Sequence, residues 1–321
     1  MTLFRGSVCA GAIVAALSVT TTMTAQQTAV PDPIVKANAT VKLARHTYAI
    51  PDGNVPLVPN VGIIVGSHAT LVIDPGLGRP NGETVLREAK KLSASNELFI
   101  TSTHFHAEHT TGAGAFPLNA AYVWSSIQAA EFDDSGAQLI QTFARRSPKT
   151  AQLLAGADRP TKGDGGNRRE VLFDREYVLD LGGVRVRFLV VGPTHTRGDT
   201  ALFVEGDTVL FAGDVVMNNS FLAATTATSM KAWLKAFDTL EALHPTTIVP
   251  SHGAIGTGAL IDANRKVMEA VQARTRELKL QGRSAEESAS AVQKELQAQH
   301  PDWPRAGGLS AAALSAYAET P

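Results

Sequence analysis

The sequence is poor in cysteine, in net charge and in long apolar runs. Its one cysteine, Cys9, lies close to the N-terminus, so the rest of the chain has no disulfide framework, no thiol nucleophile and no cysteine to ligate a metal. The formal net charge is −1 and the pI is near 6.8, which argues against nucleic acid or an anionic membrane surface as a partner. Any metal site must therefore be built from His, Asp and Glu.

The N-terminus has the order of charges and apolar residues that is typical of a secretory signal peptide. Arg5 supplies a positive charge, Val8–Val19 is a short apolar run, and small polar residues follow as far as Ala25. The run is shorter than the roughly 20 residues that a membrane span needs. We predict a signal peptide over residues 1–25 and a tail or linker over 26–40. The protein is then periplasmic or secreted, without stable membrane insertion after cleavage; an uncleaved anchor is the alternative.

The rest of the chain alternates between strand-like and helix-like patterns. Strands are expected at 41–50, 61–65, 70–73, 98–101, 176–179, 184–190, 201–204, 208–211 and 247–249. Helices are expected at 81–92, 127–132, 136–155, 230–243, 257–280, 284–299 and 309–318, with a loop at 162–167. Because helices follow each strand-rich half, we predict an α/β fold in which two mixed β-sheets pack face to face with helices outside, an αββα sandwich. One domain over residues 41–321 would include the C-terminal helices at about 257–318, and its size is near the limit for one core, about 250–300 residues.

Five of the nine histidines fall in three short clusters, and each cluster follows a predicted strand. Loops at strand ends meet at one rim when the strands share a sheet, so side chains far apart in sequence converge there. The ligand-type residues in these loops are His104, His106, Glu108, His109, His195, Asp214 and His252. The other histidines, His46, His68, His244 and His300, stand alone and receive no role.

Imidazole nitrogen and carboxylate oxygen are ligands that zinc (Zn2+) accepts at about 2.0–2.2 Å, and a catalytic zinc keeps one position open for water. Two ions about 3.5–4 Å apart share one hydroxide, and a carboxylate such as Asp214 can bridge them. The clusters therefore indicate a zinc centre with a catalytic function. Near it, Arg197 either faces a substrate carboxylate or pairs with a neighbouring acid.

From about Val61 to Gly253, the motifs and their order along the chain resemble those of the metallo-β-lactamase superfamily. That family has an early Asp, a His-x-His-x-Asp-His motif, a later His, a Gly-Asp motif and a late His. The resemblance implies two Zn2+ ions per chain, with Asp74 supporting the metal loop from behind. The implied ligands are His104, His106 and His195 for the first metal, His109 and His252 for the second, and Asp214 for both, as in the hydroxyacylglutathione hydrolase branch.

Glu108 departs from the family motif, which has Asp at this position. Its side chain is one methylene longer, so its carboxylate reaches further. It either ligates the second metal with a shifted geometry or acts as an outer-sphere base.

The resemblance implies an exported dinuclear zinc hydrolase that cleaves an ester, thioester or amide/lactam bond of a small molecule by metal-bound hydroxide. Glu108 and Asp214 are its candidate catalytic residues, because either could hold the nucleophile by a hydrogen bond. β-Lactam hydrolysis is the first alternative, although Asp214 and the lack of a mature cysteine favour a general hydrolase. A non-haem iron persulfide dioxygenase-like enzyme and a non-catalytic metal-binding protein are further alternatives. The substrate and the oligomeric state stay open.

Overall fold

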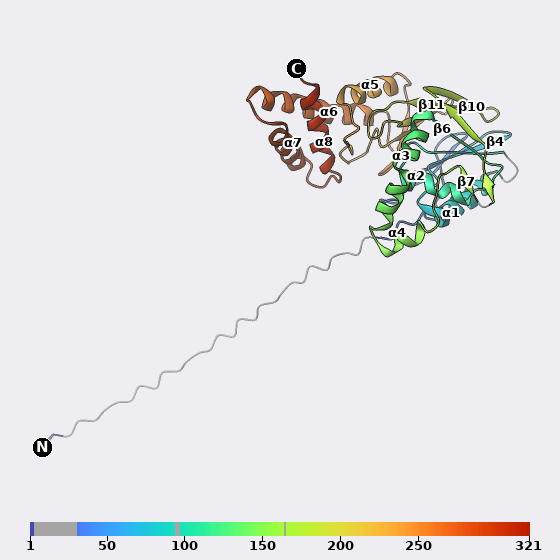
Figure 1. The fold of residues 1–321 in the computed structure, drawn as a ribbon, viewed down its shortest axis with the longest axis horizontal. Coiled ribbons are helices and arrows are strands. Elements are labelled where there is room, and N and C mark those ends of the chain that lie inside the picture. The colour runs from blue at the N-terminus through green and yellow to red at the C-terminus, as the bar shows by residue number, and fades with distance from the viewer. Residues whose placement is uncertain (3–30, 94–96, 164) are drawn as a thin grey trace. The chain divides into compact units, whose positions relative to one another are not determined.

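A computed structural model describes residues 1–2, 31–93, 97–163 and 165–321. Apart from residues 1 and 2, the predicted signal peptide (1–25) lies outside the described residues, and so do residues 26–30 of the predicted linker. From Pro31 to Pro321 the chain forms one compact unit. Figure 1 shows its two sheets on one side and the C-terminal helices on the other.

The larger sheet has seven strands in the order β1-β2-β3-β4-β5-β6-β9. They are β1 (Val41–Lys42), β2 (Thr47–Ile50), β3 (Val61–Val65), β4 (Ala69–Ile73), β5 (Glu97–Thr101), β6 (Ala121–Ser125) and β9 (Glu170–Phe173). β3 and β4, which match strands expected from the sequence, pair antiparallel as a hairpin. β4, β5, β6 and β9 run parallel, so the loops that follow β4 and β5 open at the same edge.

The smaller sheet has five strands in the order β10-β11-β12-β13-β14. They are β10 (Glu176–Asp180), β11 (Arg185–Val190), β12 (Thr200–Val204), β13 (Val209–Gly213) and β14 (Thr247–Pro250). β12 is antiparallel to both β11 and β13, and β13 is parallel to β14. The loops after β11, β13 and β14 therefore leave the sheet at one edge.

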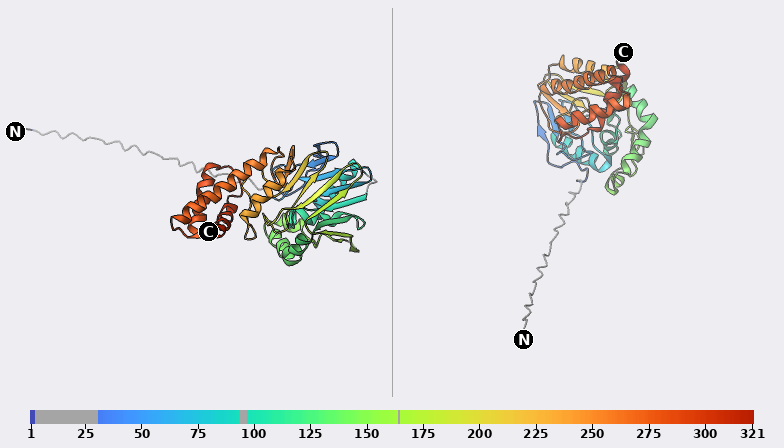
Figure 2. Two further views of the ribbon diagram at one scale, coloured as in Figure 1. Left: turned by 90° about the horizontal axis from the view of Figure 1, so that it is seen from above. Right: turned by 90° about the vertical axis from the view of Figure 1, so that its left-hand side faces the viewer.

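The helices are α1 (Gly78–Leu92), α2 (Ala107–Thr110), the 3-10 helix η1 (Thr111–Ala115), α3 (Ser126–Ala144), α4 (Pro148–Leu153), α5 (Met230–Glu241), α6 (Ala259–Leu280), α7 (Ala285–Gln299) and α8 (Gly307–Glu319). Figure 2 shows α6, α7 and α8 gathered beyond one end of the strands. Among the described residues, no helix is long and apolar enough to cross a membrane.

Three apolar layers hold the two sheets and the helices together. Between the sheets, Leu71 of the larger sheet packs in one cluster with Phe188 and Phe211 of the smaller sheet. The outer face of the larger sheet packs under α1 and α3, and the outer face of the smaller sheet packs under α5 and the C-terminal helices. Burial of these faces removes apolar surface from water and is the main stabilising term. The αββα prediction is confirmed.

Several local predictions were wrong. β6 and β9 were missed; β6 is buried along its whole length, so it lacks the alternation of polar and apolar residues that marks a half-buried strand. The helices expected at 127–132 and 136–155 are α3 and α4, because Ser147 and Pro148 start a new helix with a capping box. The expected loop at 162–167 contains a short hairpin of β7 (Lys162–Gly163) and β8 (Gly166–Asn167).

The described part of the predicted linker is anchored to α1. Asn81 accepts a hydrogen bond from the amide of Val35 at 2.8 Å, and Glu88 accepts one from the amide of Asn38 at 3.0 Å. Val35 is buried in the cluster under α1. We call residues 33–40 the N-terminal strap. It belongs to the domain because two buried polar side chains of α1 hold its backbone.

Candidate metal centre

The loop after β5 carries the first predicted cluster. β5 ends at Thr101, and His106 is the N-cap of the short helix α2. His104 and His106 lie before the helix, while Glu108 and His109 lie within it. Because α2 begins between His106 and Glu108, one short segment of chain carries all four side chains.

Three sets of ligand-type atoms converge at the rim of the two sheets, and within each set the atoms all lie within 4.8 Å of one another. The three sets are His104 with His106 and His195, His104 with His109 and Asp214, and Glu108 with His109 and His252. His104 belongs to the first and second sets, and His109 belongs to the second and third, so the three sets are linked. The convergence expected from the strand-end loops is present.

The imidazole rings of the three sets lie close to one another. Nε2 of His195 lies 3.3 Å from Nδ1 of His106, a separation over which one cation can contact both nitrogens. The ring of His109 lies 4.1 Å from that of His104 and 5.5 Å from that of His252, measured between centroids. The imidazoles of the three sets therefore lie next to one another at this rim.

Each of four imidazoles has a partner for its Nδ1, which leaves its Nε2 for the centre. The partners are the hydroxyl of Thr103 for His104 at 3.2 Å, Oδ2 of Asp74 for His109 at 3.0 Å, the carbonyl of Ala223 for His195 at 2.5 Å, and the carbonyl of Val58 for His252 at 2.9 Å. Metal-ligating histidines typically have such outer partners, which fix the tautomer and the ring orientation.

Asp74 lies behind the metal loop. It follows β4 with a φ of 56°, a left-handed conformation that Asp adopts more easily than most residues. Its Oδ1 accepts the amide of Thr103 at 2.7 Å, and its Oδ2 accepts the Thr103 hydroxyl at 2.9 Å. One carboxylate therefore holds both the loop backbone and the ring of His109.

Burial keeps three of the imidazoles neutral. It lowers the pKa of His104 and of His106 well below the ordinary value, and it lowers the pKa of His252 to about 3. The charged form is disfavoured because the rim excludes water. Neutral imidazole is the form that ligates a metal.

The pKa values of the remaining groups are set by burial and by neighbouring charges. Burial alone lowers the pKa of His109, but Asp74 outweighs it and raises that pKa to about 9. Burial raises the pKa of Glu108. Burial also acts to raise the pKa of Asp214, yet the nearby Arg305 and His195 outweigh it and hold that pKa well below its usual range.

Unsatisfied atoms test whether this donor set fits a metal. Within the described part of the chain, five buried atoms of the centre have no hydrogen-bond partner: Nε2 of His104, Oε2 of Glu108, Nδ1 and Nε2 of His109, and Oδ1 of Asp214. Of these, Nδ1 of His109 lies at ion-pair distance from Asp74, and the other four are left to the centre. Buried polar groups without a partner are costly and rare. Nitrogen and carboxylate oxygen are donors that zinc accepts, so the residues fit the expected metal.

Two residues near the centre were not predicted from the sequence to act there. Arg305, from the segment before α8, donates from Nη1 to Oδ2 of Asp214 at 2.7 Å. Glu131 lies within α3 and accepts the amides of Arg197 and Gly198, which fixes the loop of His195. No motif marks either residue, because both act through tertiary packing.

Arg197 follows the second of its two predicted alternatives. Its guanidinium contacts Glu131 at 3.4 Å and Asp134 at 3.2 Å. It is therefore engaged with acids of α3. The four histidines without a predicted role belong to none of the three ligand sets found among the described residues.

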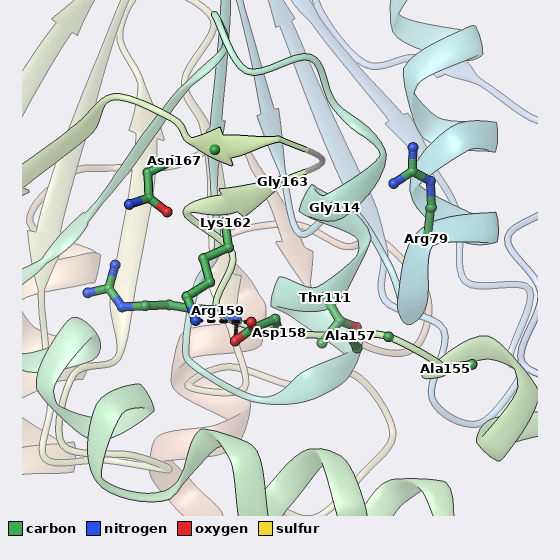
Figure 3. Close-up of a pocket in the computed structure, with 12 residues that line it drawn as sticks. Arg79, Thr111, Gly114, Ala155, Ala157, Asp158, Arg159, Lys162, Gly163 and Asn167 are labelled. Atoms are coloured by element: carbon green, nitrogen blue, oxygen red, sulfur yellow. Dashed lines mark hydrogen bonds and ion pairs between the residues drawn. The ribbon is translucent and has the colours of Figure 1, made fainter.

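A cavity of about 420 Å³ lies outside the metal centre, between η1 and the segment that runs from Ala155 through the β7–β8 hairpin (Figure 3). Cationic side chains line it, but Lys162 pairs with Asp158, and Arg159 pairs with Asp133. None of the predicted ligands lines this cavity. Its charge is balanced locally, and the centre at the sheet rim remains the candidate for chemistry.

Comparison with known proteins supports this reading. The family model of the metallo-beta-lactamase superfamily matches residues 54–252, a span that contains every predicted ligand. Two curated relatives are the human and bovine proteins named acyl-coenzyme A thioesterase MBLAC2, which are 28% identical over 180 residues and 27% identical over 177. Each match covers 51% of this chain and 60% of the relative, so the chain spans less than two thirds of their length.

Solved structures show the same fold. A metallo-beta-lactamase family protein from Thermus thermophilus matches with a TM-score of 0.58 at 18% identity, over 87% of this chain and 92% of that one. A metallo-beta-lactamase from Pontibacter korlensis matches with a TM-score of 0.55 at 18% identity, over 71% of this chain and 96% of that one. At these identities the likeness extends to the fold alone.

Proposed function

Because the chain belongs to the metallo-beta-lactamase superfamily, we propose that it is a two-zinc hydrolase that cleaves a thioester or ester bond of a small molecule. The observation that carries the proposal is the convergence of the three ligand sets at one rim. A chain that had kept the fold without the chemistry would have no need for three ligand sets that are linked through His104 and His109.

The residues proposed to hold Zn2+ are His104, His106 and His195 for one ion, Glu108, His109 and His252 for the other, and Asp214 between them. The position of Glu108 in the second triad favours ligation over the outer-sphere alternative. When bound, zinc at such a centre lowers the pKa of a coordinated water to about 7 and polarises a carbonyl oxygen. Two complete triads also favour two cations over the single iron of a persulfide dioxygenase-like site.

The two carboxylates of the centre have different duties in this proposal. Oδ2 of Asp214 is engaged by Arg305, so Asp214 orients the centre. Within the described residues Glu108 makes no ion pair, and its Oε2 has no hydrogen-bond partner. In this proposal one oxygen of Glu108 would ligate the second ion, and the other would accept the proton that leaves the attacking water and return it to the departing oxygen or sulfur. The buried rim around His104 and His109 excludes bulk water.

A thioester or ester is preferred over a β-lactam for two reasons. The relatives that align in sequence carry the name acyl-coenzyme A thioesterase, whereas the β-lactamases among the solved structures share only the fold. The ligand sets also use Asp214 and contain no cysteine. An acyl thioester is therefore the first substrate to test.

We also propose that the protein is exported, on the strength of the signal-like pattern at residues 1–25. Expression of the full chain with a C-terminal tag, followed by N-terminal sequencing of the periplasmic or secreted fraction, tests this. A mature chain that begins near Gln26 is expected. An intact N-terminus on protein that stays in the cytoplasm contradicts export.

The activity is tested with the purified zinc-loaded protein on a panel of acyl thioesters, esters, lactones, phosphodiesters and β-lactams, together with elemental analysis for zinc and iron. We expect two zinc ions per chain and fastest turnover of a thioester or ester. His106→Ala should lower activity by more than the roughly 100-fold that loss of an outer-shell partner can cost. His68→Ala, which changes an exposed histidine outside the centre, is the matched control. Full activity in metal-stripped His106→Ala protein refutes the proposal.

A further inference from the structure

The C-terminal part of the chain, which lies beyond the span matched by the family model, reaches the metal centre. Arg305 stands two residues before α8 and donates to Oδ2 of Asp214 at 2.7 Å. Its backbone has a φ of 68°, in the left-handed region that residues with a side chain rarely adopt. Such a conformation persists only where the surroundings hold it, so the aim of this guanidinium is fixed by the fold.

A second contact links the same segment to His195. The carbonyl of Ala223 accepts from Nδ1 of His195 at 2.5 Å. The backbone around Ala223 lies directly against the start of α8, since a Cβ on Gly308 would come within 2.4 Å of the carbonyl oxygen of Leu222. The orientation of His195 therefore depends on the position of α8.

Apolar and backbone contacts lock the two segments together. The amide of Phe221 donates to the carbonyl of Pro304 at 3.2 Å. The ring of Phe221 lies 5.3 Å from that of Trp303, and Trp303 stacks on His300 at 4.0 Å, measured between centroids. Phe221 is fully buried. Residues 300–308, which we call the C-terminal clasp, thus form one packed block with residues 221–224.

Arg305 contacts one of the two carboxylate oxygens of Asp214. Oδ2 is held by the guanidinium, while Oδ1 is buried and has no hydrogen-bond partner in the described part of the chain. Asp214 belongs to the ligand set with His104 and His109. A carboxylate held on one oxygen presents the other in a fixed direction. Without that partner, the side chain can rotate and the bridge between the two triads is no longer preorganised.

We propose that the C-terminal clasp positions the metal ligands Asp214 and His195, and that Arg305 is the positioning residue that sets the affinity of the centre for its second cation. The proposal rests on the two-cation centre of the proposed function but not on its substrate. The positive charge of Arg305 alone would weaken cation binding, so a loss of affinity on its removal separates positioning from simple repulsion.

The test is a titration of the metal-free protein with Co2+, followed by visible absorption, and with Zn2+ against a competing chelator. Arg305→Met removes the charge and the hydrogen bond to Asp214 but keeps a long side chain. We expect its second cation to bind about 10–100-fold more weakly, with a changed cobalt spectrum, because this is the usual cost of losing an outer-shell partner. Arg305→Lys keeps one charged donor and should recover part of the affinity.

Arg283→Met is the matched control, because Arg283 also belongs to the C-terminal helical region but contacts the exposed Glu287. It should bind both cations as the wild type does. If Arg305→Met does not fold, Arg305→Lys alone still tests the proposal through its weaker second step and altered spectrum. Two cations bound by Arg305→Met with wild-type or higher affinity overturn the proposal, as does one cation bound equally by the wild type and this variant. The metal titration needs no substrate. A wild type that binds two cations but cleaves none of the panel therefore refutes the proposed function and leaves the proposal on the C-terminal clasp standing.

Discussion

The strand-end loops and the C-terminal helices contribute to the candidate metal centre in different ways. The loops after β5, β11, β13 and β14 supply every ligand-type atom of the three sets. Helices α6, α7 and α8 supply none of these atoms, yet the clasp before α8 contacts one ligand through Arg305 and orients another through Ala223. Ligand identity therefore lies in the loops, while part of ligand orientation comes from a region with no motif.

The same division appears within the loops themselves. His109 is oriented by Asp74, which follows β4 and is part of the sheet rim. His195 is oriented by a carbonyl whose position depends on α8. One ligand is supported by the sandwich and the other by the C-terminal helices, so variants at each support should separate the two contributions.

The largest effect is expected at the support that belongs to the sandwich. In Asp74→Asn, one carboxylate oxygen becomes an amide nitrogen, which accepts no hydrogen bond, so either the amide of Thr103 or the side chains of Thr103 and His109 lose their acceptor. We expect metal affinity and hydrolysis to fall by about 10–100-fold. Chelator competition and thioesterase or esterase assays measure this.

Asp180→Asn is the control for that variant, since Asp180 is exposed, accepts the amide of Gly182 in the turn between β10 and β11, and belongs to none of the three ligand sets. Its metal affinity should match the wild type. Equal affinities in Asp74→Asn and the wild type would show that the loop keeps its shape without this carboxylate.

The sequence was informative where function depends on the ends of strands. Strand patterns placed β3, β4, β5, β13 and β14 within a few residues of their bounds, and parallel or alternate strands must bring their following loops to one edge. The clusters around His104, His195 and His252 could then be predicted to meet. The resemblance to the family added Asp74, whose position behind the loop is what the structure shows.

The clasp could not be predicted in the same way. Arg305 is a single arginine among 29 Lys and Arg residues, and its contact with Asp214 spans 91 positions. The contact depends on how three helices pack and on a left-handed backbone at a non-glycine residue, neither of which leaves a pattern in sequence. Similarly, β6 lacks alternation because both of its faces are buried.

The next effect is on stability and uses two adjacent glycines in α8. Gly308→Ala places a Cβ 2.4 Å from the carbonyl oxygen of Leu222 and 2.9 Å from two further backbone atoms, so the helix or the strip at 221–224 must shift. We expect a loss of about 1–3 kcal/mol in the free energy of unfolding, as for other overpacked sites. Urea unfolding of the metal-free protein measures it.

Gly307→Ala provides a control of opposite sign. A Cβ at Gly307 meets no atom within 4 Å, so the variant gains helix propensity, at most about 1 kcal/mol. If Gly308→Ala is as stable as Gly307→Ala and also keeps the wild-type cobalt spectrum, then α8 does not press on the segment that orients His195.

The smallest effect is expected at the N-terminal strap, which is the counterpart of the clasp at the other end of the domain. Glu88 of α1 accepts from Asn38 and Thr40 of the strap and from Lys91. Burial acts to raise the pKa of Glu88, but these hydrogen bonds outweigh it and the pKa is lowered. The carboxylate therefore stabilises the fold above its unfolded pKa of about 4.3, and this contribution is lost as the pH falls through the lower folded value.

Glu88→Gln should accordingly cost about 1 kcal/mol at pH 7, since a hydrogen bond contributes about that much net. The difference from the wild type should shrink as the pH falls through the lowered pKa, because the wild type then loses its own charge. Urea unfolding at neutral and acidic pH measures both. Metal affinity should not change, because the strap holds α1 and touches no ligand among the described residues. A fall in cation affinity in Glu88→Gln as large as in Arg305→Met would mean that the centre responds to general loosening of the domain, and the special role of the clasp would be lost.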